Sequence, residues 1–234
     1  MTINKNEKII ARILSIAIII YAFFGNVHYC CFNENFYTKE HEKITLYGKP
    51  INEHIGITKE ELKELTSFTL HYLNDTKATL DKKMNINGVE REVFTDDEKL
   101  HMVDVQRLNV VANYICVFSL SVIIISVVIY IKNRYSLKTF KMIFNKVLIY
   151  TLLIFSFIVL WIIIDFDSFW TFFHHLFFAG NDLWLLDLRK DILIMIVPPQ
   201  FFNDLVIKIS IQFILTILTV EIIVYLLNKR RLND

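Results

Sequence analysis

Four apolar runs limit what this chain can fold into. They cover residues 13–32, 110–131, 147–164 and 209–227, and a helix of about 20 residues crosses the ~30 Å hydrocarbon core of a bilayer. The composition agrees, because 54% of the 234 residues are hydrophobic and only 5 are Gly and 3 are Pro. We therefore predict an all-α membrane protein in which residues 1–234 form a single polytopic domain with four transmembrane helices.

The positions of the basic residues predict the orientation, because Lys and Arg near span ends stay on the cytoplasmic side. Basic residues precede the first span, follow the last and fill residues 132–146, which carry no acidic residue. We expect both termini to be cytoplasmic. The two other segments are acid-rich, with 11 Lys and Arg against 15 Asp and Glu in residues 30–108, and 2 against 6 in residues 165–207. From this charge distribution we predict two segments outside the membrane, an outer cap of residues 33–109 and a second outer loop of residues 165–207.

The outer cap carries clear local signals of helices. Thr58 and Thr95 each have a Glu three residues later, which is the capping-box pattern that begins a helix. Nothing between Asp96 and the end of the second span breaks a helix, so we expect one continuous helix there. Asn87-Gly88 predicts a tight turn. We therefore expect a small, mostly helical extracytoplasmic cap between spans 1 and 2.

His101 lies nine residues before the second span at Val110. At 1.5 Å per residue it would stand about 13 Å above the hydrocarbon, at the depth of the lipid headgroups. Glu98 and Asp104 lie three residues to either side, where a carboxylate could orient the imidazole or raise its pKa. The alternative is a solvated helix face on which Glu98 serves only as the capping-box partner.

The second outer loop places two histidines among aromatic residues. Aromatic side chains at intervals of three or four predict a helical extension of span three that ends at Gly180: Phe166, Trp170, Phe173 and Phe177. Consecutive helical positions differ by about 100°, so His174 and His175 cannot both face one point. We expect one to be functional and the other structural, while a plain interfacial aromatic belt remains the alternative. Trp184 and Asp187 follow as polar anchors.

The sequence lacks the motifs of several classes of enzyme and binding protein. The sequence has no Gly-rich nucleotide loop, no HExxH pair, no GxSxG elbow and no CxxC. The basic clusters flank spans, so they give no support for nucleic-acid binding. Glu221 lies inside the last span, and we interpret it as an interhelical contact. The seven histidines all lie at or beyond the predicted outer face, so any imidazole chemistry is expected there: His28, His41, His54, His71, His101, His174 and His175.

Two stretches together resemble one family. Residues 94–105 read F-T-x-x-E-x-x-H-x-x-D-V, and residues 173–202 read F-H-x-x-F-F, then W-x-x-D, then P-x-x-F-F. These patterns and the span layout resemble the Lit family of bacterial lipoprotein intramolecular transacylases, which are polytopic enzymes with four spans. The double Pro198-Pro199 departs from the single Pro of the pattern.

The resemblance implies an activity and a site. The family's two essential histidines fall on His101 and His174, so His175 would not be catalytic. The implied reaction moves the sn-2 acyl chain of a diacylglyceryl lipoprotein to the α-amine of its N-terminal Cys, giving a lyso-lipoprotein. The implied partners are such lipoproteins and membrane lipid in a bacterial cell membrane, with the site facing outside and no metal or other cofactor.

The remaining site residues have supporting roles in this hypothesis. Glu98 or Asp104 would orient His101, and Trp184 and Asp187 would shape the lip of the site. Two other functions stay open at this point. A metal-dependent membrane hydrolase could use His101, His174, Glu98 and Asp187 as ligands, and a non-enzymatic sensor or scaffold could use the outer segments to bind a partner. The sequence does not give the oligomeric state.

Overall fold

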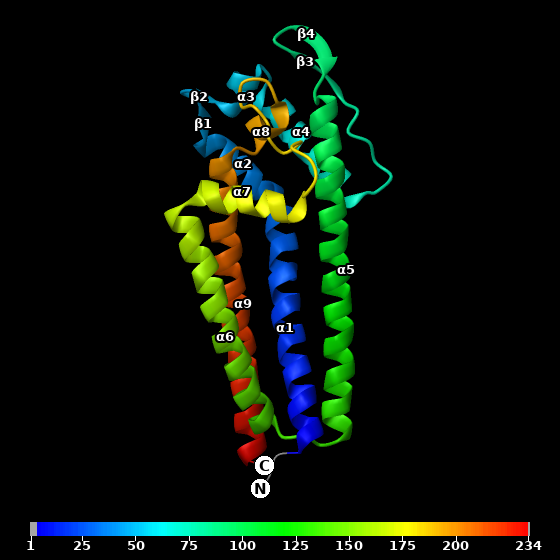
Figure 1. Ribbon diagram of the computed structural model, residues 1–234, viewed down its shortest axis with the longest axis vertical. Coiled ribbons are helices and arrows are strands. Elements are labelled where there is room, and N and C mark those ends of the chain that lie inside the picture. Colours follow the sequence, from blue (N-terminus) through cyan, green and yellow to red (C-terminus); the bar gives the residue numbers. More distant parts are fainter. Residues whose placement is uncertain (1–3, 234) are drawn as a thin grey trace. The chain divides into compact units, whose positions relative to one another are not determined.

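A computed structural model describes residues 4–233. Within this range, four helices are long and apolar enough to cross a membrane: α1 (Lys5–Cys31), α5 (Asp96–Lys132), α6 (Leu137–Ile164) and α9 (Pro199–Asn233) (Figure 1). Each predicted span coincides with part of one of them. The prediction of an all-α, multi-pass membrane protein with four spanning helices is confirmed.

The chain divides into two compact units, and the first contains most of the four long helices. It comprises the residues up to His28, Ala112–Asp165 and the residues from Lys208 onward. Its core is built from aromatic and aliphatic side chains of all four helices: Ala11, Leu14, Ile19, Ala22, Tyr130, Phe140, Ile143, Phe144, Leu148, Phe213, Ile217 and Val224. Many other apolar side chains of these helices face outward, as helices that meet lipid require.

Polar side chains inside this unit find partners on neighbouring helices. Asn26 on α1 donates to Thr216 Oγ1 on α9 at 3.0 Å. With its amide turned so that both atoms are satisfied, Asn145 on α6 donates to Glu221 Oε1 on α9 at 2.7 Å. The interhelical contact predicted for Glu221 is therefore present, and it supplies the hydrogen bond that a carboxyl group in a span needs.

The second unit comprises Tyr29–Val111 and Phe166–Ile207. It contains the end of α1, the starts of α5 and α9, five shorter helices and two hairpins. The helices are α2 (Glu34–Lys43), α3 (Ile51–Ile55), α4 (Lys59–Asn74), α7 (Phe166–Phe177) and α8 (Ile192–Ile196). The hairpins are β1 (Thr45–Leu46) with β2 (Lys49–Pro50) and β3 (Lys83–Ile86) with β4 (Val89–Glu92).

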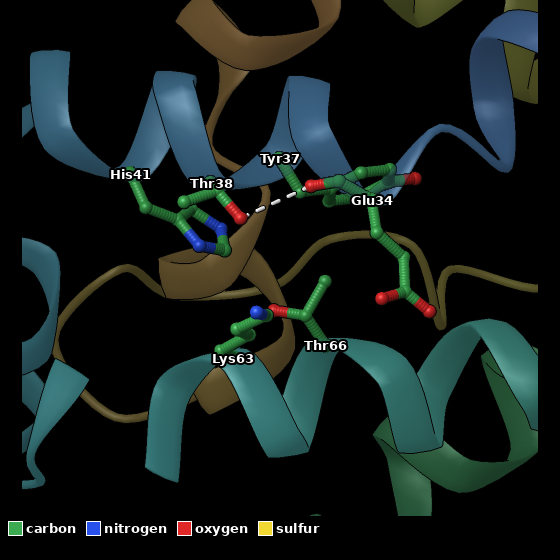
Figure 2. A pocket seen from close by; sticks show the side chains of 6 residues that line it. All are labelled: Glu34, Tyr37, Thr38, His41, Lys63 and Thr66. Carbon is green, nitrogen blue, oxygen red and sulfur yellow. Dashed lines mark hydrogen bonds between the residues drawn. The ribbon is translucent and has the colours of Figure 1, made fainter. Parts of the chain in front are cut away.

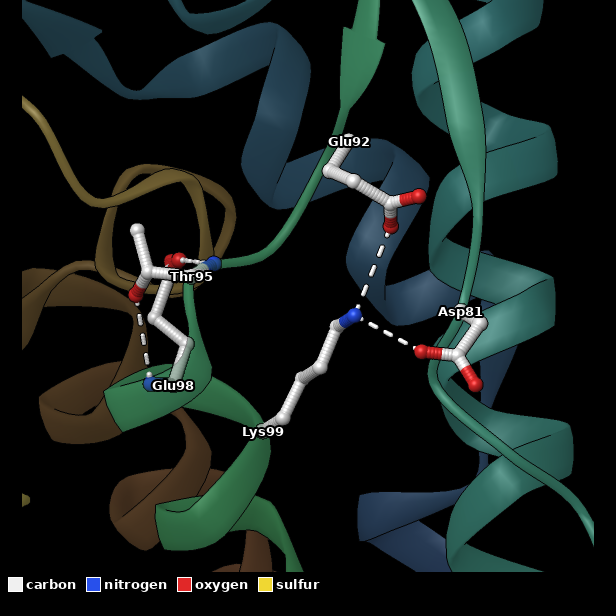
Figure 3. A network of polar contacts seen from close by, with 5 residues as sticks. All are labelled: Asp81, Glu92, Thr95, Glu98 and Lys99. Carbon is white, nitrogen blue, oxygen red and sulfur yellow. Dashed lines mark hydrogen bonds and ion pairs between the residues drawn. The ribbon is translucent and has the colours of Figure 1, made fainter.

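Local sequence signals explain how several of these elements begin and turn. Thr58 and Glu61 make both hydrogen bonds of a capping box at the start of α4. The β3–β4 turn is Asn87-Gly88, with φ of 53° and 85°, values that favour Asn and Gly in a two-residue hairpin. The helix start and the turn were both predicted from the sequence, and both predictions are confirmed. The β3–β4 hairpin is fastened to α5 by Lys99, which forms ion pairs with Asp81 at 2.7 Å and Glu92 at 3.4 Å (Figure 3).

The predicted connection between span three and the aromatic segment that follows it is wrong. We expected the aromatic segment after span three to continue that helix, but α6 ends at Ile164 and α7 begins anew at Phe166. Asp165 between them has φ −150° and ψ 83°, which is not helical. Asp favours such breaks because its side chain competes for nearby backbone groups. The aromatic segment is thus an independent helix, and its end before Gly180, at φ 115°, agrees with the prediction.

The core of the first unit makes a testable prediction about stability. Phe144 is fully buried, whereas Phe157 on the same helix is 72% exposed. Phe144→Ala should lower the free energy of unfolding by the order of 2 kcal/mol, because it leaves a cavity that neighbouring helices fill only in part.

The matched control is Phe157→Ala, which leaves no cavity and should change stability little. Thermal unfolding of both variants in detergent measures the difference. Equal midpoints for the two variants would contradict the helix packing described here.

Candidate functional site

The second unit brings two of the predicted site histidines together. His101 lies on α5 and His174 on α7, and their ring centroids are 6.2 Å apart with planes inclined by 27°. Both side chains are buried, with exposed fractions of 8% and 5%. His175 is exposed, so the two neighbouring histidines face different surroundings, as helical geometry requires. The residues of two distant segments therefore form one candidate site.

His174 is held in one orientation by its own helix. Its Nδ1 hydrogen-bonds the backbone carbonyl of Trp170 at 2.8 Å, one turn earlier. A carbonyl oxygen only accepts, so Nδ1 carries the proton and Nε2 keeps its lone pair. The ring is packed between Trp170, with centroids 4.4 Å apart, and Trp184, with centroids 4.7 Å apart. This arrangement fixes the tautomer of the neutral imidazole, in which Nε2 can accept a proton.

Burial lowers the pKa of both histidines. The pKa of His101 is lowered to about 4, mainly by burial and further by the neighbouring His174, while Asp104 raises it. The pKa of His174 is also lowered by burial, against the effect of its bond to Trp170. Asp104 raises the pKa of His101, as its spacing allows, but desolvation of the imidazolium outweighs this attraction and the net shift is downward. Both rings are neutral near pH 7.

His101 leaves one polar atom without a partner. Its Nδ1 is buried and forms no hydrogen bond within the described part of the chain. The edge of the Phe178 ring packs against it, with centroids 5.2 Å apart. A buried polar atom without a partner costs free energy, so Nδ1 of His101 is ready for a hydrogen bond from another molecule.

Among the described residues, the Glu98 carboxylate hydrogen-bonds backbone groups of two segments and forms no hydrogen bond with His101. Its carboxylate is fully buried and accepts from Thr95 N at 2.6 Å, the capping-box bond drawn in Figure 3, and from Leu193 N at 2.6 Å. The start of α5 is thereby tied to the start of α8. The alternative of a solvated helix face is therefore wrong, because Glu98 and His101 are buried. The capping-box role of Glu98 is present, and its second oxygen also holds the other outer segment.

Asp104 connects the same two segments a turn later. Its Oδ2 accepts from Asn181 Nδ2 at 3.1 Å, beyond the end of α7, and its Oδ1 accepts from Arg107 at 3.3 Å. It forms no hydrogen bond with His101 in the described structure and acts on that ring only through space. Asp104 therefore fixes the position of α5 relative to the loop that carries Trp184.

Trp184 and Asp187 have different positions. The Trp184 ring lies nearly parallel to His174, inclined by 28°, and its Nε1 is buried without a partner among the described residues. Asp187 accepts from Arg189 Nε at 3.1 Å and Nη2 at 3.0 Å, which lowers the pKa of its carboxyl group. Trp184 is part of the site, whereas Asp187 builds the adjacent turn.

Sequence reasoning missed two contributions to the site. The first is the Trp170 carbonyl, which sets the proton position on His174, and the spacing of four residues on a helix could have shown it. The second is Phe178, whose ring contacts both imidazoles, with centroids 5.2 Å from His101 and 5.5 Å from His174. The side chains of Trp170 and Phe178 are part of one aromatic wall around the histidines.

A small pocket elsewhere in the second unit does not compete with this site. It lies between α2 and α4 (Figure 2) and has a volume of about 10 Å³, room for about one water molecule. Its lining residues are Glu34, Tyr37, Thr38, His41, Lys63 and Thr66. His41 is already engaged, because its Nε2 hydrogen-bonds Ile196 O at 2.9 Å.

The arrangement does not supply the ligands of the metal-dependent alternative. Over residues 4–233, no group of three or more His, Cys, Asp or Glu side chains is placed to hold a metal ion. Of the four expected ligands, Glu98 is bound to two backbone N–H groups and Asp187 to Arg189. His101 and His174 alone do not make a metal site.

Glu98 predicts a change in stability. Glu98→Gln replaces one accepting oxygen by an NH₂ group, which then faces a backbone N–H, so we expect a loss of about 1–3 kcal/mol. Glu61→Gln is the matched control, because Glu61 belongs to the other capping box and is solvent-accessible. Thermal unfolding and hydrogen exchange of the Leu193 amide measure the effect. Unchanged protection of that amide would show that the Glu98–Leu193 bond is absent.

The lowered pKa of His101 predicts how stability depends on pH. The unfolded chain binds a proton near pH 6.5, whereas folded His101 does so only near pH 4. Stability is therefore complete above about pH 6.5 and falls as pH drops toward 4, by at most roughly 1.4 kcal/mol per pH unit for this ring.

Apparent unfolding midpoints between pH 4 and 7 test this dependence. His101→Phe should reduce the slope and leave the part that comes from the other buried histidines, His174 and His41. Replacement of the exposed His71 on α4 should leave the wild-type slope. An undiminished slope in His101→Phe would assign the pH dependence to other groups.

Comparison with known proteins finds one family whose model matches this chain. A family model described as "Lipoprotein intramolecular transacylase Lit" matches residues 12–202, which is most of the chain. Among curated proteins, no significant match is found.

Solved structures agree in fold. The membrane-integral lipoprotein intramolecular transacylase Lit from Bacillus cereus is 22% identical, with 97% of this chain and 98% of that chain covered and a TM-score of 0.76. A variant of the same protein with a His-to-Arg mutation is 21% identical, with coverage of 97% and 95% and a TM-score of 0.71. A His-to-Ala variant is 21% identical, with coverage of 96% and 92% and a TM-score of 0.66.

Proposed function

The chain belongs to the Lit family of lipoprotein intramolecular transacylases, and from this premise we propose that it catalyses an O-to-N acyl shift. In this proposal the sn-2 acyl chain of a diacylglyceryl-modified lipoprotein moves to the α-amine of the lipoprotein's own N-terminal Cys. The product is an N-acylated lyso-lipoprotein. Family membership makes the chain an enzyme that acts on lipoproteins, so the sensor or scaffold interpretation is set aside.

One observation carries the proposed mechanism. The neutral imidazoles of His101 and His174 are stacked in an aromatic enclosure, with their ring centroids 6.2 Å apart. An acyl shift needs a group that takes a proton from the amine and returns it to the departing oxygen. A neutral imidazole with a free nitrogen suits both tasks, whereas an imidazolium would have no lone pair. The burial that lowers both pKa values keeps the rings in the useful form.

His174 is the better candidate for the proton transfer. Its Nδ1–H is committed to Trp170 O, which leaves Nε2 as the basic atom and supports the charge that forms on the ring. As the amine nitrogen bonds to the ester carbonyl carbon, Nε2 accepts the amine proton. When the bond from that carbon to the glyceryl oxygen breaks, the same proton passes to the oxygen, and the product is an amide and a free hydroxyl group.

His101 has a complementary role in this mechanism. Its Nδ1 lacks a partner and accepts a hydrogen bond from the second N–H of the amine, which turns the nitrogen lone pair toward the ester. With a pKa lowered to about 4, His101 is a weaker base than free imidazole and does not compete for the transferred proton. The reaction balances without an external acid, base or co-substrate.

We place this site on the outer side of the cell membrane, with both termini in the cytoplasm. The basic residues that flank the spans support this orientation, and diacylglyceryl lipoproteins present their N-terminal Cys at the membrane surface. The position of His101, nine residues before the span at Val110, would put it near the ester at headgroup depth.

The test is expression in a bacterium that makes only diacyl lipoproteins, followed by mass spectrometry of N-terminal lipopeptides. The wild-type chain should convert them to the lyso, N-acylated form. His101→Ala and His174→Ala should each reduce product by at least about 10²-fold, the usual contribution of a positioned acid or base. His175→Ala is the matched control and should retain most of the activity, because that ring is exposed.

The outcomes separate the parts of the proposal. If the wild-type chain leaves the lipopeptides diacylated, the proposed reaction is wrong. If it forms the lyso product and His174→Ala does so equally well, the reaction stands and the assignment of the base fails.

A further inference from the structure

The Trp184 indole N–H is a buried hydrogen-bond donor that the mechanism above does not use. Its Nε1 has almost no contact with solvent and no acceptor within the described part of the chain. Leaving such a donor unpaired lowers stability, and native structures usually satisfy buried polar groups. A ring needed only for packing could be Phe at no such cost, so the N–H itself requires an explanation.

The position of the indole ties this donor to the reacting groups. Its ring is stacked on His174, with centroids 4.7 Å apart and planes inclined by 28°. Hydrogen bonds of both rings lie in the ring planes, and these planes run side by side. Such a stack allows a single reacting centre to contact His174 through one of its atoms and the indole N–H through the next.

The two unpaired atoms of the site have complementary characters. Nδ1 of His101 accepts a hydrogen bond when the ring proton is on Nε2, whereas Nε1 of Trp184 can only donate one. The substrate of an acyl shift offers the matching pair, an amine that donates and an ester carbonyl oxygen that accepts. Of the two ester oxygens, the carbonyl oxygen is the one that becomes negatively charged when the amine attacks.

We propose that the Trp184 indole N–H donates a hydrogen bond to the carbonyl oxygen of the migrating acyl group and stabilises it as an oxyanion. This inference rests on the transacylation proposed above. As the carbon–nitrogen bond forms, the carbonyl π electrons move onto this oxygen and the hydrogen bond strengthens. When the bond to the glyceryl oxygen breaks, the electrons return and the carbonyl reforms. The indole keeps its proton throughout, so no further reactant is needed.

The aromatic enclosure increases the effect of one donor. Rings of Trp170, Phe173 and Phe178 surround His174, and a hydrogen bond to a charged oxygen is stronger where water is excluded. Because the N–H is fixed by stacking before substrate binds, no reorganisation is needed when charge develops. The donor acts on the transition state more than on the bound ester.

The experiment replaces the N–H without changing the ring. Benzothienylalanine at position 184, introduced by amber suppression, has a sulfur atom in place of the indole N–H and nearly the same shape. Trp184→Phe removes both the donor and part of the ring. Trp161→Phe on α6 is the matched control. Rates are measured on a synthetic diacylglyceryl lipopeptide in mixed micelles, with mass spectrometry of the lyso product.

We expect kcat to fall about 10²-fold in the benzothienylalanine protein, as when one oxyanion donor is removed, with KM nearly unchanged. The pH dependence of the rate should stay that of the wild type, because the histidines are intact. Thermal stability should be equal or higher, because an unpaired buried donor has been removed. Trp161→Phe should keep the wild-type rate.

Other results would overturn the inference. A wild-type kcat with benzothienylalanine, even if Trp184→Phe is slow, would show that only the shape of the ring matters. A higher KM at unchanged kcat would limit the indole to ground-state binding. A wild-type protein that forms no lyso product would refute the reaction itself, a result distinct from the loss of the donor alone.

Discussion

The buried carboxylate of Glu98 is the interaction on which the site depends. It accepts the N–H of Thr95 at the start of α5 and the N–H of Leu193 at the start of α8, each at 2.6 Å. One charged group thus fixes two segments that lie far apart in the sequence, and backbone hydrogen bonds compensate for its burial. His101 follows one turn later on α5, so its position is set by the same anchor. Asp104 with Asn181 repeats the connection on the next turn.

Burial then decides the chemical state of the histidines. A carboxylate three residues from His101 suggests a raised pKa from the sequence, yet desolvation is the larger effect and lowers it to about 4. The two carboxylates that could have stabilised an imidazolium are turned to other partners, Glu98 to backbone N–H groups and Asp104 to Asn181. The two carboxylates therefore hold the segments in position, and the imidazoles stay neutral. Neutral rings suit a reaction that begins by taking a proton from an amine.

The sequence predicts elements better than it predicts contacts between them. Run length and charge predicted the four long helices, and Thr58-x-x-Glu61 and Asn87-Gly88 predicted a helix start and a turn, because these signals act within a few residues. The break at Asp165 was missed, because apolar and aromatic periodicity continues through it. Helical geometry separated His174 from His175, but only the family resemblance paired His174 with His101. The Glu98–Leu193 bond has no sequence signal, since one partner is a backbone N–H group.

The same reasoning explains why two outer segments are needed for one site. A single helix such as α5 or α7 can bury at most one side of an imidazole, and the rest would stay in water near its ordinary pKa. The wall around His174 comes from its own helix through Trp170, and from the segment after the helix through Phe178 and Trp184. The wall around His101 comes from α7 and its end through His174 and Phe178. The second outer segment thus supplies most of the apolar surface around both histidines, and α5 adds the His101 ring against His174. The hydrogen bonds that join the segments therefore also control the proton chemistry.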